Sequence, residues 1–151
     1  MANTQAMCTS FKVEILGGVH AIGTPPTRGS TAKDTFKAAL YLASATVNAA
    51  TTAYNASGEV SGAGYSAGGI TVSNATAPTS TGTTAYWTPS ASLTYSAVTL
   101  TTAFDAVLIY NSTQGDKAVA VYTFGSQTVT AGNFILTMPT NDASTALLRI
   151  A

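Results

Sequence analysis

The sequence has few charged residues. Asp, Glu, Lys and Arg make up 8% of its 151 residues, where about 25% is usual for a globular domain. Six basic residues balance six acidic ones, so there is no excess positive charge for nucleic acid or an anionic membrane surface. An almost uncharged surface keeps monomers apart poorly. We therefore expect the protein to work as part of a larger assembly.

Cysteine and long apolar runs are also scarce. The single cysteine, Cys8, excludes an internal disulfide framework, and we interpret it as a small buried thiol. No apolar run approaches the roughly 18 residues of a membrane span, and the first residues do not resemble a signal peptide. One histidine and one cysteine among scattered carboxylates have no metal-ligand spacing, so we expect no metal and no cofactor.

Hydrophobic residues make up 46% of the chain, which is enough for the core of a single domain over 1–151. The N-terminal segment, 1–22, predicts one short helix. Thr9 or Ser10 is a candidate N-cap, Phe11 and Ile15 share one helical face, and a Gly-Gly pair at 17–18 ends the run. Residues 23–34 are rich in Pro, Gly, Ser and Thr and predict a flexible loop.

Later segments predict about eight strands at short spacing. Residues 35–43 alternate between a core face (Phe36, Ala38, Leu40, Leu42) and a mixed face (Lys37, Ala39, Tyr41). Residues 104–111 predict a central strand, and 112–117 a hairpin turn with Gly115-Asp116 at its tip. Residues 127–139 predict a strand, or a pair with a tight turn at Ala131-Gly132. We expect a mainly β fold, an antiparallel, jelly-roll-like β-sandwich with one short N-terminal helix.

The stretch "GYSAGG" at 64–69 matches two catalytic patterns. Residues 64–68 fit the nucleophile elbow G-x-S-x-G around Ser66, and 62–67 loosely fit the dinucleotide fingerprint G-x-G-x-x-A. The only histidine, His20, precedes Ser66, whereas in α/β-hydrolases it follows, and the residues after 69 indicate a strand rather than a helix. A hydrolase with His20, Asp34 or Asp105, and Ser66 or a later serine is our lowest-ranked hypothesis. We therefore expect that the protein is not an enzyme. Residues 57–69 are instead predicted to form a glycine-rich connection, whose Tyr65 packs on the sandwich or on a neighbouring subunit.

Other polar residues have structural interpretations. We expect His20 near the C-terminus of the helix, where the helix dipole favours it. We expect Asp105 to be buried and paired with Lys117 or Arg149. Two further carboxylates, Asp34 and Glu59, lie in polar loops and are predicted to be solvated.

Six residues are candidates for contact with a partner protein because apolar and aromatic side chains predominate in such interfaces. They are Phe11, Ile15, Tyr54, Tyr65, Tyr86 and Trp87. The apolar face of the N-terminal helix either anchors on a neighbouring subunit or packs on its own sandwich, and we favour the second arrangement. Trp87 is interpreted as a core or interface residue; in an alternative hypothesis it is the centre of an exposed aromatic platform that binds glycans.

Three stretches, "MANTQAMCTSFKVEILGG", "DTFKAALYLASATVNAATTAYNASGEVSGAGYSAGG" and "FDAVLIYNSTQGDKAVAVYTFGSQTVTAGNFILTMPTNDASTALLRIA", together resemble a family of small virion-associated structural proteins of tailed bacteriophages. The resemblance covers most of the chain, with 24–33 and 74–90 as variable parts. It implies no catalytic residues. It implies a virion protein made in the host cytoplasm, either a capsid cement (decoration) protein or a tail or neck component.

The partners that this resemblance implies are the major capsid protein or other virion proteins, with no nucleic acid and no membrane. Capsid lattice symmetry favours a homotrimer at local threefold positions. The alternative is a receptor- or glycan-binding module of a tail fibre.

Overall fold

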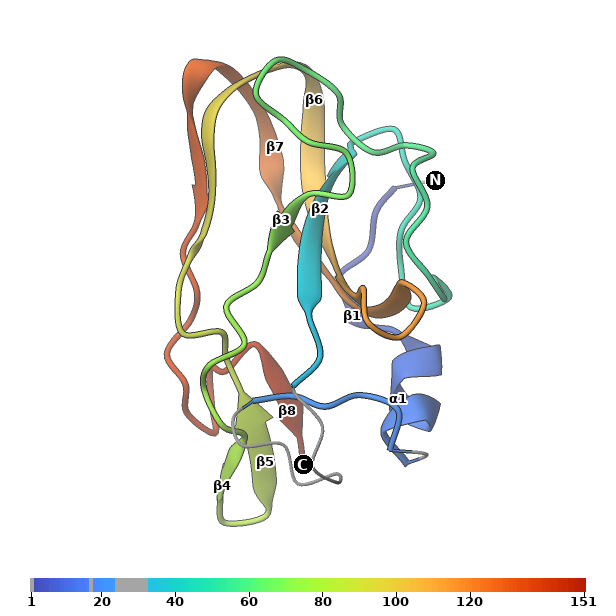
Figure 1. Ribbon diagram of the computed structural model, residues 1–151, viewed down its shortest axis with the longest axis vertical. Coiled ribbons are helices and arrows are strands. Elements are labelled where there is room, and N and C mark those ends of the chain that lie inside the picture. The colour runs from blue at the N-terminus through green and yellow to red at the C-terminus, as the bar shows by residue number, and fades with distance from the viewer. Residues whose placement is uncertain (1, 17, 24–32) are drawn as a thin grey trace.

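The computed structural model describes residues 2–16, 18–23 and 33–151. These residues form one helix and eight strands, arranged in two antiparallel sheets (Figure 1). The elements are β1 (Ala6–Met7), α1 (Thr9–Leu16), β2 (Phe36–Leu42), β3 (Ile70–Thr71), β4 (Thr79–Thr81), β5 (Thr84–Trp87), β6 (Leu93–Asn111), β7 (Lys117–Leu136) and β8 (Leu148–Ile150). The prediction of a mainly β, antiparallel, sandwich-like fold with one short N-terminal helix is confirmed.

Strands β6 and β7 form a long ribbon that folds back over itself. They pair from Leu93↔Leu136 at the open end to Asn111↔Lys117 beside the hairpin turn. Their register shifts on both sides of Phe104, and irregularities of this kind bend a strand. In Figure 1 both strands turn over at the top of the molecule. The proximal half of the ribbon (104–111 with 117–123) and its returning half (93–100 with 129–136) therefore lie in different layers.

The continuity of these two strands differs from the sequence prediction. The Thr-rich run ending near 102 and the apolar run from 104 form a single strand, β6, of 19 residues. Of the two alternatives for residues 127–139, the continuous strand is confirmed and the turn at Ala131-Gly132 is wrong, because both residues lie inside β7. Ala131 instead has a positive φ of 47° where the register with β6 shifts. The hairpin turn at 112–116 is confirmed.

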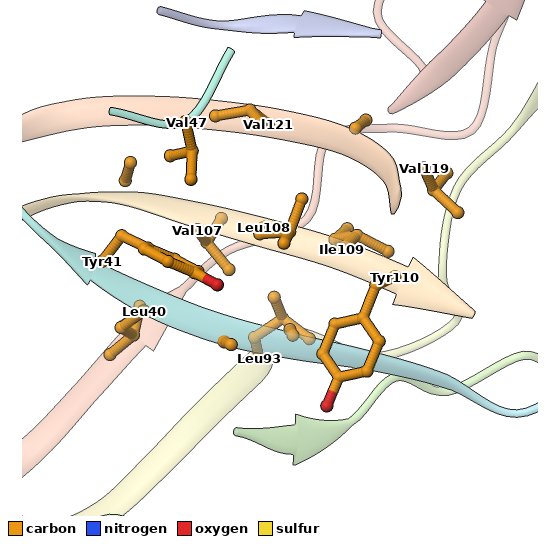
Figure 2. Packing of buried hydrophobic residues seen from close by; sticks show 14 of the residues in the cluster. Leu40, Tyr41, Val47, Leu93, Val107, Leu108, Ile109, Tyr110, Val119 and Val121 are labelled. Carbon is orange, nitrogen blue, oxygen red and sulfur yellow. The ribbon is translucent and has the colours of Figure 1, made fainter. Parts of the chain in front are cut away.

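The larger sheet has the strand order β1-β7-β6-β2-β3 and is covered on both faces. One face packs against the returning half of the ribbon, where the Tyr95 hydroxyl donates to the Ala38 carbonyl at 2.8 Å; Leu93 of that half and Leu40 of β2, both labelled in Figure 2, belong to the same buried cluster. The other face packs against the segment 43–58, from which Val47 points toward Leu108. Tyr41 is 1% exposed and its hydroxyl donates a hydrogen bond to the Asn55 carbonyl at 2.5 Å. The mixed face of β2 is therefore largely covered, with Ala39 and Tyr41 buried and Lys37 half-buried.

Helix α1 packs on β7 of its own chain. Phe11 and Cys8 are fully buried, as the favoured arrangement of the N-terminal segment requires. The helix ends where predicted, with Gly18 at φ 66° and the Val19 amide donating to the Glu14 carbonyl at 2.9 Å. Positive φ at a helix C-terminus favours glycine. Of the predicted flexible loop 23–34, residues 24–32 lie outside the described residues.

The smaller sheet has the order β4-β5-β8. Trp87 at the end of β5 pairs with Leu148 of β8 and is 3% exposed. Its indole Nε1 donates to the Thr76 carbonyl at 2.9 Å, and its ring lies 6.2 Å from that of Phe36. Trp87 therefore connects the small sheet to the core of the large one.

Candidate binding groove and polar clusters

An apolar groove of about 260 Å³ lies between the N-terminal segment and the small sheet. Four of the six predicted contact residues line it, namely Phe11, Ile15, Tyr86 and Trp87. The remaining lining residues are Met7, His20, Ala21, Ile22, Pro78, Ala85, Leu148 and Ile150. None of these side chains is an acid, a lysine or an arginine, so the groove suits an apolar, uncharged segment.

Phe11 and Trp87 form the floor of this groove rather than its accessible surface. They are 0% and 3% exposed, so their role is mainly in the core, and Trp87 is not an exposed aromatic platform for a sugar. Ile15 and Tyr86 are half-buried and accessible from the groove. Ile150 is 51% exposed. It was not among the predicted contact residues, because its position at the groove depends on the pairing of the short strand β8 with β5.

The other two predicted contact residues, Tyr54 and Tyr65, meet at the carboxylate of Glu59. The hydroxyl of Tyr54 donates to Oε2 at 2.6 Å. The hydroxyl of Tyr65 donates to Oε1 at 2.7 Å, and the Gly68 amide donates to the same oxygen at 2.8 Å. Glu59 is thus a structural acceptor for three donors, and the expectation that it is solvated is wrong.

The pKa values of the tyrosines in and beside this cluster are raised. Burial and the hydrogen bond to Glu59 raise the pKa values of Tyr54 and Tyr65 far above the ordinary range. Burial also raises the pKa of Tyr110 to about 12; its ring stacks on Tyr54 at 4.8 Å. Both predicted contact tyrosines therefore act as neutral hydrogen-bond donors inside the chain.

The glycine-rich connection 57–69 is confirmed, and its glycines are required by close packing. A Cβ on Gly69, which has φ 71°, would lie 1.8 Å from the Ala38 carbonyl oxygen of β2. A Cβ on Gly64, which has φ 78°, would lie 2.3 Å from the Ala97 carbonyl oxygen of β6. The connection thus packs tightly against both β2 and the returning half of the ribbon. Tyr65 packs on the sandwich as predicted, with its ring 6.0 Å from that of Tyr95.

His20 is the hub of a second polar cluster, not a partner for Ser66. Its side chain is fully buried, with Nε2 2.7 Å from Glu14 Oε2 and Nδ1 2.9 Å from Asn111 Nδ2. Because the Asn111 amide nitrogen is a donor, Nδ1 must be the acceptor, so the neutral Nε2–H tautomer fits both contacts. Both ring nitrogens are therefore engaged, and Ser66 lies on an exposed loop.

Asn111 joins this histidine to Asp34. Its Nδ2 also donates to Asp34 Oδ2 at 2.8 Å, while its Oδ1 accepts the amides of Thr113 and Gln114 at 3.1 and 3.2 Å. Asp34 is 3% exposed, so the expectation that it is solvated is wrong. The cluster fixes the hairpin turn against the start of β2.

Ion pairing in this region also differs from expectation. Lys117 Nζ lies 2.7 Å from Glu14 Oε1, whereas Asp105 accepts a hydrogen bond from Asn3 Nδ2 at 2.5 Å. The expected pairing of Asp105 with Lys117 or Arg149 is therefore wrong. Burial raises the pKa of Glu14, but hydrogen bonds from Lys117 and His20 outweigh it and leave that pKa below its usual range. Burial lowers the pKa of His20 in spite of the nearby carboxylates.

A cleft of about 550 Å³ opens beside β7 and is lined by both halves of the folded ribbon. Leu93 and Leu136 contribute from the returning half, and Val107, Ile109 and Val121 from the proximal half. Among the residues that the structure describes, no three His, Cys, Asp or Glu side chains gather as a metal site. No helix in the described ranges has the length and apolarity to cross a membrane.

Comparison of the chain with protein-family models, with curated proteins and with solved structures finds no match.

Proposed function

We propose that this protein is a non-catalytic structural component of a bacteriophage virion, most specifically a capsid cement protein that stabilises the head lattice. The apolar groove carries the proposal, because it gathers accessible apolar side chains at one place on an otherwise weakly charged chain. Ile15, Tyr86 and Ile150 would contact an apolar segment of the major capsid protein or of another virion protein. The sequence resemblance described above supports the virion as the location.

The polar clusters are consistent with a structural role. The carboxylates of Glu14, Asp34 and Glu59 all accept hydrogen bonds from the chain's own side chains. The side chain of the single histidine, His20, contacts Glu14 and Asn111 through its two ring nitrogens and does not lie beside an exposed nucleophile. The affinity of this protein for a repeated capsid lattice would then come from many weak contacts per particle rather than from strong charge pairs.

The test is to add purified protein to capsids that lack it and to measure bound copies per particle. The variant Ile150→Asp places a charge at the rim of the groove and should reduce binding by about tenfold or more. Thr101→Asp adds the same charge at an exposed position of β6 outside the groove and should bind as the unmodified chain does. Equal binding by the two variants would contradict the groove as the contact.

Copy number and position distinguish the two virion roles. A cement protein occupies many equivalent lattice positions in a cryo-EM map of the particle, whereas a tail or neck component is present in a few copies. A handful of copies at the tail would refute the cement assignment. The same map reports the symmetry of the bound copies.

A further inference from the structure

Among the residues that the structure describes, no strand lies beside the outer edge of β7 in the returning half of the ribbon. β1 pairs only with Val121 and Ala120 of β7, and residues 124–136 have main-chain pairing only with β6. In Figure 1 the returning half of the ribbon forms the left margin of the molecule. The edge therefore presents a row of main-chain donors and acceptors to solvent.

This edge lacks the charges and the proline that usually protect an exposed strand, and its only irregularities are the register shifts with β6 over residues 123–134. Natural edge strands carry lysine, proline or inward-pointing charges that prevent pairing with another chain. Here no charged residue occurs between Lys117 and Asp142, and the only proline in that interval, Pro139, follows the strand. The adjacent strand and loop are equally neutral, because residues 60–104 contain no charge. Ile135, which is 53% exposed, lies on this strand.

We propose that residues 124–136 of β7 pair antiparallel with the same residues of a second copy, forming a twofold dimer with one continuous sheet. An edge that meets an identical edge must carry no unbalanced charge, because like charges would face each other across the twofold axis. The uncharged β7 edge meets this requirement. A heterologous protein would have no charge pattern on this edge by which to be selected.

The number of available hydrogen bonds is sufficient for such a dimer. Alternate residues of a regular antiparallel strand point both main-chain groups toward one neighbour, so at most about six residues in 124–136 point away from β6. The register shifts around Ala131 reduce this number, and two copies would form at most about 12 main-chain hydrogen bonds across the junction, where about 10 ± 5 is usual for a protein interface.

The inference concerns the purified chain in solution and does not rest on the virion role. Sedimentation velocity over a wide concentration range should give a species of two 15.2 kDa chains at high concentration. Because the contact is uncharged, its strength should change little with salt. In hydrogen exchange, alternate amides of 124–136 should become protected as concentration rises, while those of 93–100 do not change.

Charged substitutions locate the contact. The double variant Thr130→Lys/Ile135→Lys places like charges on the edge strand of both copies and should weaken dimerisation by about tenfold or more. The control Thr94→Lys/Thr101→Lys adds the same charge to exposed positions of β6, where Thr94 lies directly opposite Ile135. The control should dimerise as the unmodified chain does. Circular dichroism checks that both double variants are folded. If a double variant is not folded, the two corresponding single variants are measured in its place.

Three results would overturn the proposal: a monomer at all concentrations, a trimer as the stable species, or a dimer that the edge variant leaves intact. The first removes the contact, and the other two place it elsewhere. A dimer that fails to bind capsids would refute the virion role and leave the edge pairing standing.

Discussion

Replacing Glu59 tests whether its carboxylate holds the glycine-rich connection on the sheet. In Glu59→Ala the hydroxyls of Tyr54 and Tyr65 and the amide of Gly68 lose their acceptor, which they contact at 2.6, 2.7 and 2.8 Å. A hydrogen bond to a charged group contributes about 1.5–3 kcal/mol. Because Glu59 and Tyr54 are only half-buried, water replaces part of the loss, and we expect about 3 kcal/mol in total.

Thermal and urea unfolding measure this change. For a domain of this size about 3 kcal/mol corresponds to a fall in Tm of about 6–12 °C. Glu59→Gln keeps one oxygen, which can continue to accept from Tyr65 and Gly68, and should cost about 1 kcal/mol. Asp116→Asn is the control, because it removes the same charge from an exposed turn position and should change stability by less than about 0.5 kcal/mol.

The order of the three variants decides the interpretation. Neutral surface substitutions usually change the free energy of unfolding by less than about 0.5 kcal/mol. If the free energies of unfolding of Glu59→Ala and of the Asp116→Asn control differ by no more than this, the cluster does not stabilise the fold. If Glu59→Gln is as unstable as Glu59→Ala, the charge rather than the remaining acceptor geometry is responsible.

Three further predictions follow from other sites. The folded-state pKa of His20 is lowered by burial, so the unfolded chain takes up its proton first and stability should fall as pH drops below about 6.5, by at most about 1.4 kcal/mol per pH unit; urea titrations should show no such slope in His20→Gln. Gly69→Ala should destabilise by more than about 3 kcal/mol, because its Cβ would overlap the Ala38 carbonyl at a positive φ; normal stability would show that the connection shifts freely. Cys8 is fully buried with its pKa raised to about 11, so a thiol reagent should react only with unfolded protein, and fast labelling of the native chain would contradict the packing of α1.

The sequence indicated the fold class, the N-terminal helix and the hairpin turn because their signals are local. Turn residues at Gly115-Asp116 and the glycines after residue 16 act on their immediate neighbours. The continuity of β6 was not predictable in the same way. Its Thr-rich first part and its apolar second part differ in composition because they lie in different layers, although one strand carries both.

The polar clusters were missed for a related reason. Asp34 is bonded to Asn111 and Gln114, which are 77 and 80 residues away in the sequence, and no local pattern encodes such a contact. In the sequence Glu59 has only the pattern of a loop carboxylate, because the tyrosines that donate to it follow no helical or strand period. Four of the six predicted contact residues nevertheless meet at one groove, since apolar side chains flanking a small sheet and a short helix share the same need for burial.

Because the ribbon of β6 and β7 folds over itself, both layers of this protein depend on the register of the same pair of strands. Side chains alternate between faces along a strand, so a slip of one residue exchanges its core and solvent faces. In a sandwich built from separate hairpins such an error stays in one layer. Here a one-residue insertion in the turn 112–116 would displace β7 against β6 over the proximal half and, past the bend, over the returning half as well. The length of that single turn is therefore expected to tolerate change less than the length of any other described loop.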